Sequence, residues 1–406
     1  MRSRYLDGSI QGICFASGKM AFVYGPRQCG TTTFGKMLLK RRASGLYWNW
    51  DDVEFRRIWA KHPRQAVPAA PAGVVPMLVL DEIHKDRRWK RTLKGVYDTL
   101  ETPCDILVTG SSRLNVYMRG SDSLLGRYYP FRLHPFSLRE LAMGKPSASA
   151  ELAERIFARS LEPASGSVEA LDLLMRFGPF PEPLLGQEER RARLWRRTRS
   201  RIIVREELRD LSRTPELARI EMMVALLPER VGAPFSVTSL REDLEVSHDT
   251  VKRWLTYLKE LFYLFEVKPY SRKVPRSLRK EGKVYLWEYR EVEDEAARFE
   301  NLVASHLLKA CHYWTDTGEG AFDLTYLRNK EKQEIDFLVL RDGRPWLPVE
   351  VKLRQTDPSP NWRRFLDVLG CKHGIQVVAA PAWRIHDIGS CKVLVAGAAE
   401  ILNYLV

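Results

Sequence analysis

Residues 25–33, GPRQCGTTT, follow an apolar run at residues 20–24 and precede a segment of helical pattern at residues 34–39. An apolar strand, a glycine loop and a helix N-terminus in this order form a P-loop, in which backbone N–H groups and the positive end of the helix dipole surround phosphates. The loop residues expected to bind a nucleotide are Gly25, Pro26, Arg27, Gln28, Cys29, Gly30, Thr31, Thr32 and Thr33. The sequence therefore predicts a phosphate site where this helix begins.

One position departs from the P-loop pattern G-x-x-x-x-G-K-[ST], which has lysine directly after the second glycine. This sequence has Thr31 there. Because that lysine places a positive charge on the β and γ phosphates, its absence removes a main electrostatic contribution to triphosphate binding and turnover. Lys36 lies about 140° round the helix from position 31, so we do not expect it to take over this role. Thr32 is still placed to bring a hydroxyl to Mg²⁺.

A second apolar run, at residues 76–80, ends in the carboxylates Asp81 and Glu82. This is the Walker B form, in which a buried strand brings the aspartate to the metal ion and the glutamate to a water molecule. A third run, at residues 105–109, ends in polar residues that place Ser111 beside the γ phosphate. The alternative is an ordinary α/β sheet with polar turns. The three features in this order favour a site for ATP and Mg²⁺, with Thr32 and Asp81 at the metal and Glu82 as a catalytic residue.

Length and composition are those of a soluble globular protein with two or three domains. The chain has 406 residues, of which 45% are hydrophobic and 29% charged. We find no apolar run approaching 18 residues and no signal-peptide pattern, which predicts a cytoplasmic protein without a membrane partner. The six cysteines include no C-x-x-C pair, which suits a reducing compartment and argues against structural zinc. The net charge of +14 favours a polyanionic partner, DNA in the first place.

We expect the P-loop domain to cover residues 1–145 and a basic helical lid to cover residues 146–225. Arg127 follows a glycine in a loop, where it could act as an arginine finger on the γ phosphate of a neighbouring subunit or be an ordinary surface arginine. The lid carries closely spaced arginines, which are either a solvated helix face or phosphate contacts. These are Arg196, Arg197, Arg199, Arg201 and Arg205.

Residues 226–285 have a winged-helix outline: a helix at 238–244, a turn at 245–246, a second helix at 247–261 and a strand at 262–267. Ser247 is a plausible N-cap of the second helix. In a DNA reader this helix lies in the major groove, so His248, Lys252 and Arg253 would face the bases and phosphates. Winged helices also serve as protein interfaces in ATPases, and the sequence leaves both roles open.

Residues 286–406 contain a second candidate site on two strands, 334–340 and 346–352. Asp336 lies on the first strand, and Glu350 and Lys352 share a face of the second because they are two residues apart. In this D-x(n)-E-x-K arrangement two carboxylates hold Mg²⁺ and the lysine steadies the attacking water, as phosphodiester hydrolysis requires. Glu300, on a helical stretch upstream, is the third candidate ligand. A β-hairpin with ordinary surface charges is the alternative.

Together these motifs resemble a prokaryotic family of AAA+ type ATPases with a winged helix and a C-terminal domain of the restriction-endonuclease-like superfamily. The likeness covers nearly the whole chain. It rests on residues 25–28, 30, 32–33, 81–83, 109–113, 124–127, 177–182, 300–303, 334–337 and 350–352. It implies an α/β P-loop domain with a parallel sheet, ATP binding, assembly of copies of the chain into a ring of six, and a role near DNA. Thr31 departs from the lysine of the family, and Trp287 and Glu288 stand where the family often has an aspartate.

The sequence thus favours an ATP-binding AAA+ type protein that acts on DNA, carries a metal-dependent nuclease-like domain and hydrolyses ATP poorly because of Thr31. One alternative is a nucleotide-gated oligomeric scaffold in which both sites have lost catalysis. Another is a defence-type signalling ATPase without nuclease activity. The sequence does not decide whether the C-terminal domain cleaves DNA or only holds it.

Overall fold

The computed structural model describes residues 3–69, 71–112, 114, 124–160, 166–207, 217–271, 281–355 and 357–406. The chain divides into two compact units, Met1–Pro135 and Phe136–Val406. The sequence predicts that the P-loop domain ends at residue 145, whereas the first unit ends at Pro135. The predicted lid, winged helix and C-terminal domain all lie in the second unit. Within the described ranges no helix combines the length and the apolar character needed to cross a membrane.

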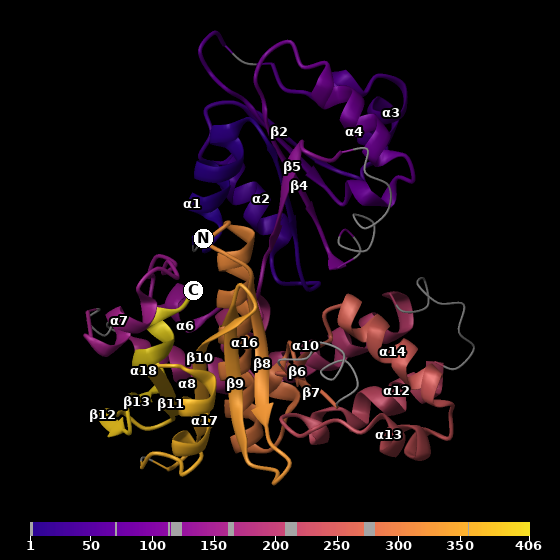
Figure 1. The fold of residues 1–406 in the computed structure, drawn as a ribbon. Coiled ribbons are helices and arrows are strands. Elements are labelled where there is room, and N and C mark those ends of the chain that lie inside the picture. Colours follow the sequence, from indigo (N-terminus) through magenta and orange to yellow (C-terminus); the bar gives the residue numbers. More distant parts are fainter. Residues whose placement is uncertain are drawn as a thin grey trace. The chain divides into compact units, whose positions relative to one another are not determined.

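The first unit is an α/β domain around a parallel sheet (Figure 1). The strand order is β2-β3-β4-β1-β5, and each neighbouring pair is parallel. Strands β1 and β3 are buried along their whole length, which explains their continuous apolar sequences. Its strands are β1 (Met20–Tyr24), β2 (Gly45–Asn49), β3 (Met77–Asp81), β4 (Asp105–Gly110) and β5 (Tyr128–Arg132), and its helices are α1 (Asp7–Ser9), α2 (Thr31–Leu39), α3 (Val53–Lys61) and α4 (Trp89–Asp98).

The second unit begins with helices and ends with a mixed sheet (Figure 1). Helix α16 packs on strand β8, and the core beside α17 is built from residues of β9, α17 and β13. The helices are α6 (Leu138–Leu141), α7 (Leu152–Phe157), α8 (Ser167–Phe177), α9 (Pro181–Gly186), α10 (Glu189–Ile202), α12 (Leu217–Leu226), α13 (Val237–Leu244), α14 (His248–Glu260), α16 (Glu295–Asp316), α17 (Trp362–Leu369) and α18 (Ala398–Ile401).

The sheet of the second unit has the order β12-β13-β11-β10-β9-β8-β6-β7. The hairpin expected at residues 334–352 is present as the antiparallel pair β9 and β10, and β11 lies parallel to β10. Strands β6 and β7 form an antiparallel hairpin next to helix α14, and β6 also pairs with β8. The strands are β6 (Leu264–Pro269), β7 (Lys283–Leu286), β8 (Phe322–Arg328), β9 (Glu334–Arg341), β10 (Arg344–Lys352), β11 (His373–Val378), β12 (Trp383–Ile388) and β13 (Cys391–Gly397).

Because β6 and β7 belong to this sheet, the helices α13 and α14 are joined to the C-terminal sheet by shared strands. Ser247 caps α14, its hydroxyl accepting a hydrogen bond from the Thr250 N–H at 3.1 Å. The buried face of α14 includes Val251, Leu255 and Leu258, the apolar positions that define its helical period. This part of the chain therefore follows the order of elements expected of a winged helix.

Candidate functional site

Close contacts with neighbouring residues fix the conformation of the loop after β1. A Cβ atom at Gly25 would lie 2.1 Å from the carbonyl oxygen of Leu133, so only glycine fits there. Gly30 has φ 98° and is the N-cap residue of α2. The buried guanidinium of Arg4 donates a hydrogen bond to the carbonyl of Cys29 at 3.0 Å, which helps to fix the position of the loop. The result is a loop that leads into a helix N-terminus, the arrangement that binds phosphates.

Asp81 lies at the centre of a hydrogen-bond network at the carboxyl edge of the parallel sheet. The hydroxyl of Thr32 donates to Asp81 Oδ2 at 2.8 Å, and the hydroxyl of Tyr47 donates to the same oxygen at 2.7 Å. The hydroxyl of Thr109 donates to Oδ1 at 2.7 Å, and Asn49 donates to Oδ2 at 3.1 Å. The carboxylate is fully buried. A threonine hydroxyl and an aspartate in contact form the pair that holds Mg²⁺ in P-loop proteins.

Glu82 and Ser111 meet, as their positions at the ends of neighbouring strands predict. The backbone N–H of Ser111 donates to Glu82 Oε1 at 3.0 Å. Burial raises the pKa of Glu82, and the nearby charge of Lys85 opposes this rise. Glu82 itself has φ 58°, a left-handed conformation that is uncommon outside glycine. Arg113, part of the motif that carries the family likeness, lies outside the described residues.

Thr31 is the first residue of helix α2, and its side chain has no hydrogen-bond partner in the described part of the chain. Lys36 does not replace the missing lysine: its Nζ lies 4.5 Å from the ring centroid of Tyr47. Lys85 is also engaged, since its Nζ lies 2.7 Å from the carboxylate of Asp51. Both lysines are thus already engaged with other groups in this structure.

Arg127 is not part of this constellation. Its guanidinium makes a two-point ion pair with Asp98, at 2.6 and 2.9 Å. The carbonyl of Arg127 accepts from the N–H of Met20, so the residue lies at the amino edge of the sheet, opposite the P-loop edge. Arg127 therefore cannot serve the P-loop of its own chain in this arrangement.

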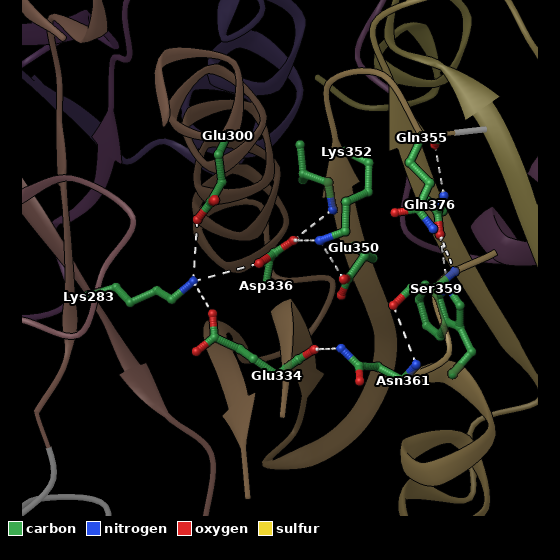
Figure 2. A network of polar contacts seen from close by, with 12 residues as sticks. Lys283, Glu300, Glu334, Asp336, Glu350, Lys352, Gln355, Ser359, Asn361 and Gln376 are labelled. Carbon is green, nitrogen blue, oxygen red and sulfur yellow. Dashed lines mark hydrogen bonds and ion pairs between the residues drawn. The ribbon is translucent and has the colours of Figure 1, made fainter. Parts of the chain in front are cut away.

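The second unit brings the predicted residues of the C-terminal site together (Figure 2). Asp336 Oδ2 accepts the N–H of Val351 at 2.8 Å and lies 3.9 Å from Lys352 Nζ. Lys352 Nζ lies 2.7 Å from Glu350 Oε1, while the buried Oε2 atom of Glu350 has no partner among the described residues. Strand pairing places Asp336 and Glu350 on neighbouring strands β9 and β10.

A residue that the sequence analysis did not assign, Lys283, occupies the middle of this group (Figure 2). Its Nζ lies 3.3 Å from Glu300, 2.5 Å from Glu334 and 3.7 Å from Asp336. The side chain is 1% exposed. In the described ranges, no group of three or more acidic, histidine or cysteine side chains is arranged to hold a metal ion. Glu300, Asp336 and Glu350 therefore lie in an ion-pair network with Lys283 and Lys352, and their role as metal ligands stays a prediction.

Burial and mutual repulsion shift the titration of these carboxyls. Burial, followed by the charge of Asp336, raises the pKa of Glu300 to about 7. The same two causes raise the pKa of Glu350 to about 7. Burial alone would lower the pKa of Lys283, but Glu300, Asp336 and Glu334 together raise it above its usual range. Lys283 is therefore an ammonium ion at neutral pH.

The residues of α14 that the sequence predicts to contact DNA are exposed, whereas one of the closely spaced arginines of the lid is buried. Lys252, Arg253 and His248 on α14 point to solvent, and a groove of about 620 Å³ between α14 and the β6–β7 hairpin includes His248 and Lys252 in its lining. In the lid, Arg199 is instead buried: its guanidinium lies 4.3 Å from the ring centroid of Phe180. Arg199 is consequently a packing residue rather than a phosphate contact.

Comparison with known proteins identifies the first unit. Residues 17–142 match the family model of an AAA domain. The chain contains an AAA-type P-loop ATPase domain. Residues 168–288 and 296–395 match models of two domains of unknown function, DUF8612 and DUF4143.

Relatives and solved structures are distant. The chain is 21% identical over 262 residues to the uncharacterized protein Rv2008c of Mycobacterium tuberculosis, covering 64% of this chain and 52% of that protein. It is 26% identical over 229 residues to the uncharacterized protein MJ1637 of Methanocaldococcus jannaschii, covering 51% and 46%. The chain thus spans about half the length of these curated relatives. Among solved structures, the Walker-type ATPase PABY2304 of Pyrococcus abyssi has 14% identity and a TM-score of 0.42, covering 72% of this chain and 94% of that one.

Proposed function

We propose that the AAA domain binds ATP with Mg²⁺ at the loop of residues 25–33. The observation that supports this most is the contact between the hydroxyl of Thr32 and the carboxylate of Asp81, at 2.8 Å. Thr32 and Asp81 would hold the metal ion near the β and γ phosphates, and the N-terminus of α2 supplies N–H donors. When bound, the ion would supply positive charge that Thr31 does not supply.

Affinity for a fluorescent ATP analogue tests this assignment through its dependence on Mg²⁺. We expect Thr32→Ala to weaken binding on the order of tenfold when Mg²⁺ is present, because it removes a metal-directed hydroxyl, and to have little effect in EDTA. Thr92→Ala is the matched control, since among the described residues the hydroxyl of Thr92 bonds only to the carbonyl of Arg88 in its own helix. Equal affinity of the chain and Thr32→Ala under both conditions would place the nucleotide elsewhere.

We propose further that hydrolysis at this site is impaired. Thr31 supplies no charge to the phosphates, and Glu82 is turned to the N–H of Ser111. Arg127 lies at the opposite edge of the sheet from its own P-loop. In this proposal it acts as an arginine finger on the P-loop of a neighbouring copy, once its ion pair with Asp98 opens. A ring of six copies is the assembly that would use it.

We propose that DNA binds to the winged-helix segment of the second unit. Lys252 and Arg253 are exposed on α14. The sequence of residues 272–280 adds further lysines and arginines. The sequence carries a net charge of +14, which favours a polyanionic partner. Such contacts to phosphates give affinity without sequence preference.

Removal of these two charges should weaken DNA binding in a salt-dependent way. For the double variant Lys252→Ala/Arg253→Ala we expect lower affinity for every duplex sequence and a salt slope reduced by about two, since each phosphate contact contributes about 0.9. Fluorescence anisotropy over a range of salt concentrations measures this slope. Arg57→Ala/Lys61→Ala, which removes two exposed charges from α3, is the control. An unchanged slope in the α14 variant would rule out this surface.

For the C-terminal domain we propose a role in holding DNA or a protein partner rather than cleaving it. Metal-dependent cleavage is the second candidate, favoured by the proximity of Asp336, Glu350 and Lys352. We prefer the first because no described cluster of side chains is arranged to hold a metal ion. The chain would then be an ATP-gated DNA-binding protein or scaffold.

A further inference from the structure

The acidic site of the second unit already contains a cation. The ammonium of Lys283 lies 2.5 to 3.7 Å from oxygens of Glu300, Glu334 and Asp336, which come from helix α16 and strand β9. Figure 2 shows the side chain reaching from β7 into the space between these carboxylates. Its position is the one that a metal ion shared by these carboxylates would take.

A metal ion does not fit beside this ammonium. Mg²⁺ binds oxygen ligands at about 2.0–2.1 Å in near-octahedral geometry, so an ion shared by Glu300 and Asp336 would need the carboxylates that now contact Lys283. The two cations would also repel each other within a few ångströms in a buried site. The metal expected at Glu300, Asp336 and Glu350 is therefore incompatible with Lys283 in its present position.

Local structure holds Lys283 in place from several sides. Lys283 and Tyr285 are two residues apart on β7 and share a face, and the hydroxyl of Tyr285 donates to the same Glu300 carboxylate at 2.6 Å. Glu300 is covered by the backbone at Gly232, where a Cβ atom would lie 3.2 Å from Glu300 Oε1. The N–H of Gly232 bonds to the carbonyl of Val284, next to Lys283. The lysine thus belongs to the built site and is not a surface side chain folded inward.

We propose that Lys283 is a built-in cation that replaces the divalent metal of the nuclease-like site, and that its removal leaves a site for a divalent cation. The inference concerns the second unit alone and is independent of ATP binding at the P-loop. Lys283 stabilises the carboxylates by charge-assisted hydrogen bonds, as a metal would. It supplies one positive charge where a divalent metal ion supplies two.

The first arm of the test compares the full chain with Asp336→Asn. Isothermal titration with Mn²⁺ in the absence of nucleotide gives the number of ions bound by each. Any ion held at the P-loop is common to both proteins, so the difference reports the C-terminal site. We expect no Mn²⁺ that depends on Asp336. One Asp336-dependent ion per chain would overturn the proposal, whatever the fate of other variants.

The second arm removes the ammonium with a side chain of similar length. We expect Lys283→Met to bind one Mn²⁺ that the parent chain does not bind, and to lose it in Lys283→Met/Asp336→Asn. We also expect Mn²⁺ to raise the melting temperature of Lys283→Met, a readout that works even if this variant is only marginally folded. Lys259→Met, which breaks the more exposed pair with Glu266, is the matched control. A folded Lys283→Met that gains neither binding nor stability from Mn²⁺ would contradict the proposal.

Discussion

Thr31→Lys should increase the rate of Mg²⁺-dependent ATP turnover by between about tenfold and 150-fold. The lysine restores a charge-assisted contact to the β and γ phosphates, and such a contact is worth about 1.5–3 kcal/mol. A difference of about 1.4 kcal/mol corresponds to a factor of ten in rate. The start of helix α2 can accept the longer side chain, since Thr31 is only half-buried and has no recorded partner in the described structure. Steady-state phosphate release with and without DNA measures the effect.

The matched control for this gain is Thr92→Lys, which adds the same charge to helix α4, away from the P-loop. It should leave turnover at the level of the parent chain. If the parent chain already turns over as fast as Thr31→Lys, another cation serves the phosphates and the impairment by Thr31 is refuted. If neither turns over, the loss lies elsewhere in the site and the scaffold function gains support.

Lys309→Met should lower the free energy of unfolding of the second unit by about 3–5 kcal/mol, the usual cost of removing one partner of a buried ion pair. Lys309 on α16 forms an ion pair with Glu140 of α6, and its Nζ donates to the hydroxyl of Ser137 at 3.0 Å. Both charged side chains are at most 3% exposed. The variant leaves the carboxylate of Glu140 buried without its counter-ion. Denaturant unfolding of the full chain, followed by circular dichroism, measures the loss.

Two variants make this second prediction specific. Lys259→Met breaks a more exposed ion pair, with Glu266 at 2.8 Å, and should cost no more than about 1 kcal/mol. The double variant Lys309→Met/Glu140→Gln should recover part of the loss, because it removes the uncompensated charge. An effect of Lys309→Met no larger than that of Lys259→Met would show that the buried pair does not stabilise the fold.

The P-loop domain was predictable because its information is local. Apolar runs followed by a glycine loop, by Asp81 and Glu82, and by Ser111 place these residues at one edge of a parallel sheet, whatever the intervening sequence. The structure places them there, and the AAA family model matches the same region. The partners of Asp81 were harder to predict, because Tyr47 and Asn49 contact it from β2, the edge strand that pairs with β3.

The ends of helices and strands were less predictable where one follows the other through a tight turn. The strand expected from residue 262 begins at Leu264, because the end of helix α14 continues through a tight C-terminal turn. In this turn the N–H of Tyr263 bonds to the carbonyl of Leu258 and Phe262 has φ 54°. An apolar residue in such a turn looks like a strand residue by hydropathy alone.

The structure brings the predicted residues of the C-terminal site together, while their proposed metal chemistry stays a prediction. Asp336, Glu350 and Lys352 follow from the period of two in a hairpin. Lys283 lies 53 residues before Asp336, and only the fold brings it into contact with the carboxylates. The available sequence signal was that Lys283 and Tyr285 share one face of an apolar strand, which does not by itself identify the acidic partners of Lys283. The ion pair of Arg127 with Asp98 likewise depends on the fold, and the distance between the two residues in the sequence does not predict it.

The most direct test of nucleotide binding is an experimental structure of the full chain with Mg²⁺ and a non-hydrolysable ATP analogue. We predict phosphates in contact with the backbone N–H groups of residues 27–32, and Mg²⁺ bound by the hydroxyl of Thr32 with Asp81 beside it. We also predict that no side chain takes the place of the missing lysine at residue 31. Nucleotide bound at another surface, or an empty loop at saturating analogue, would contradict the account.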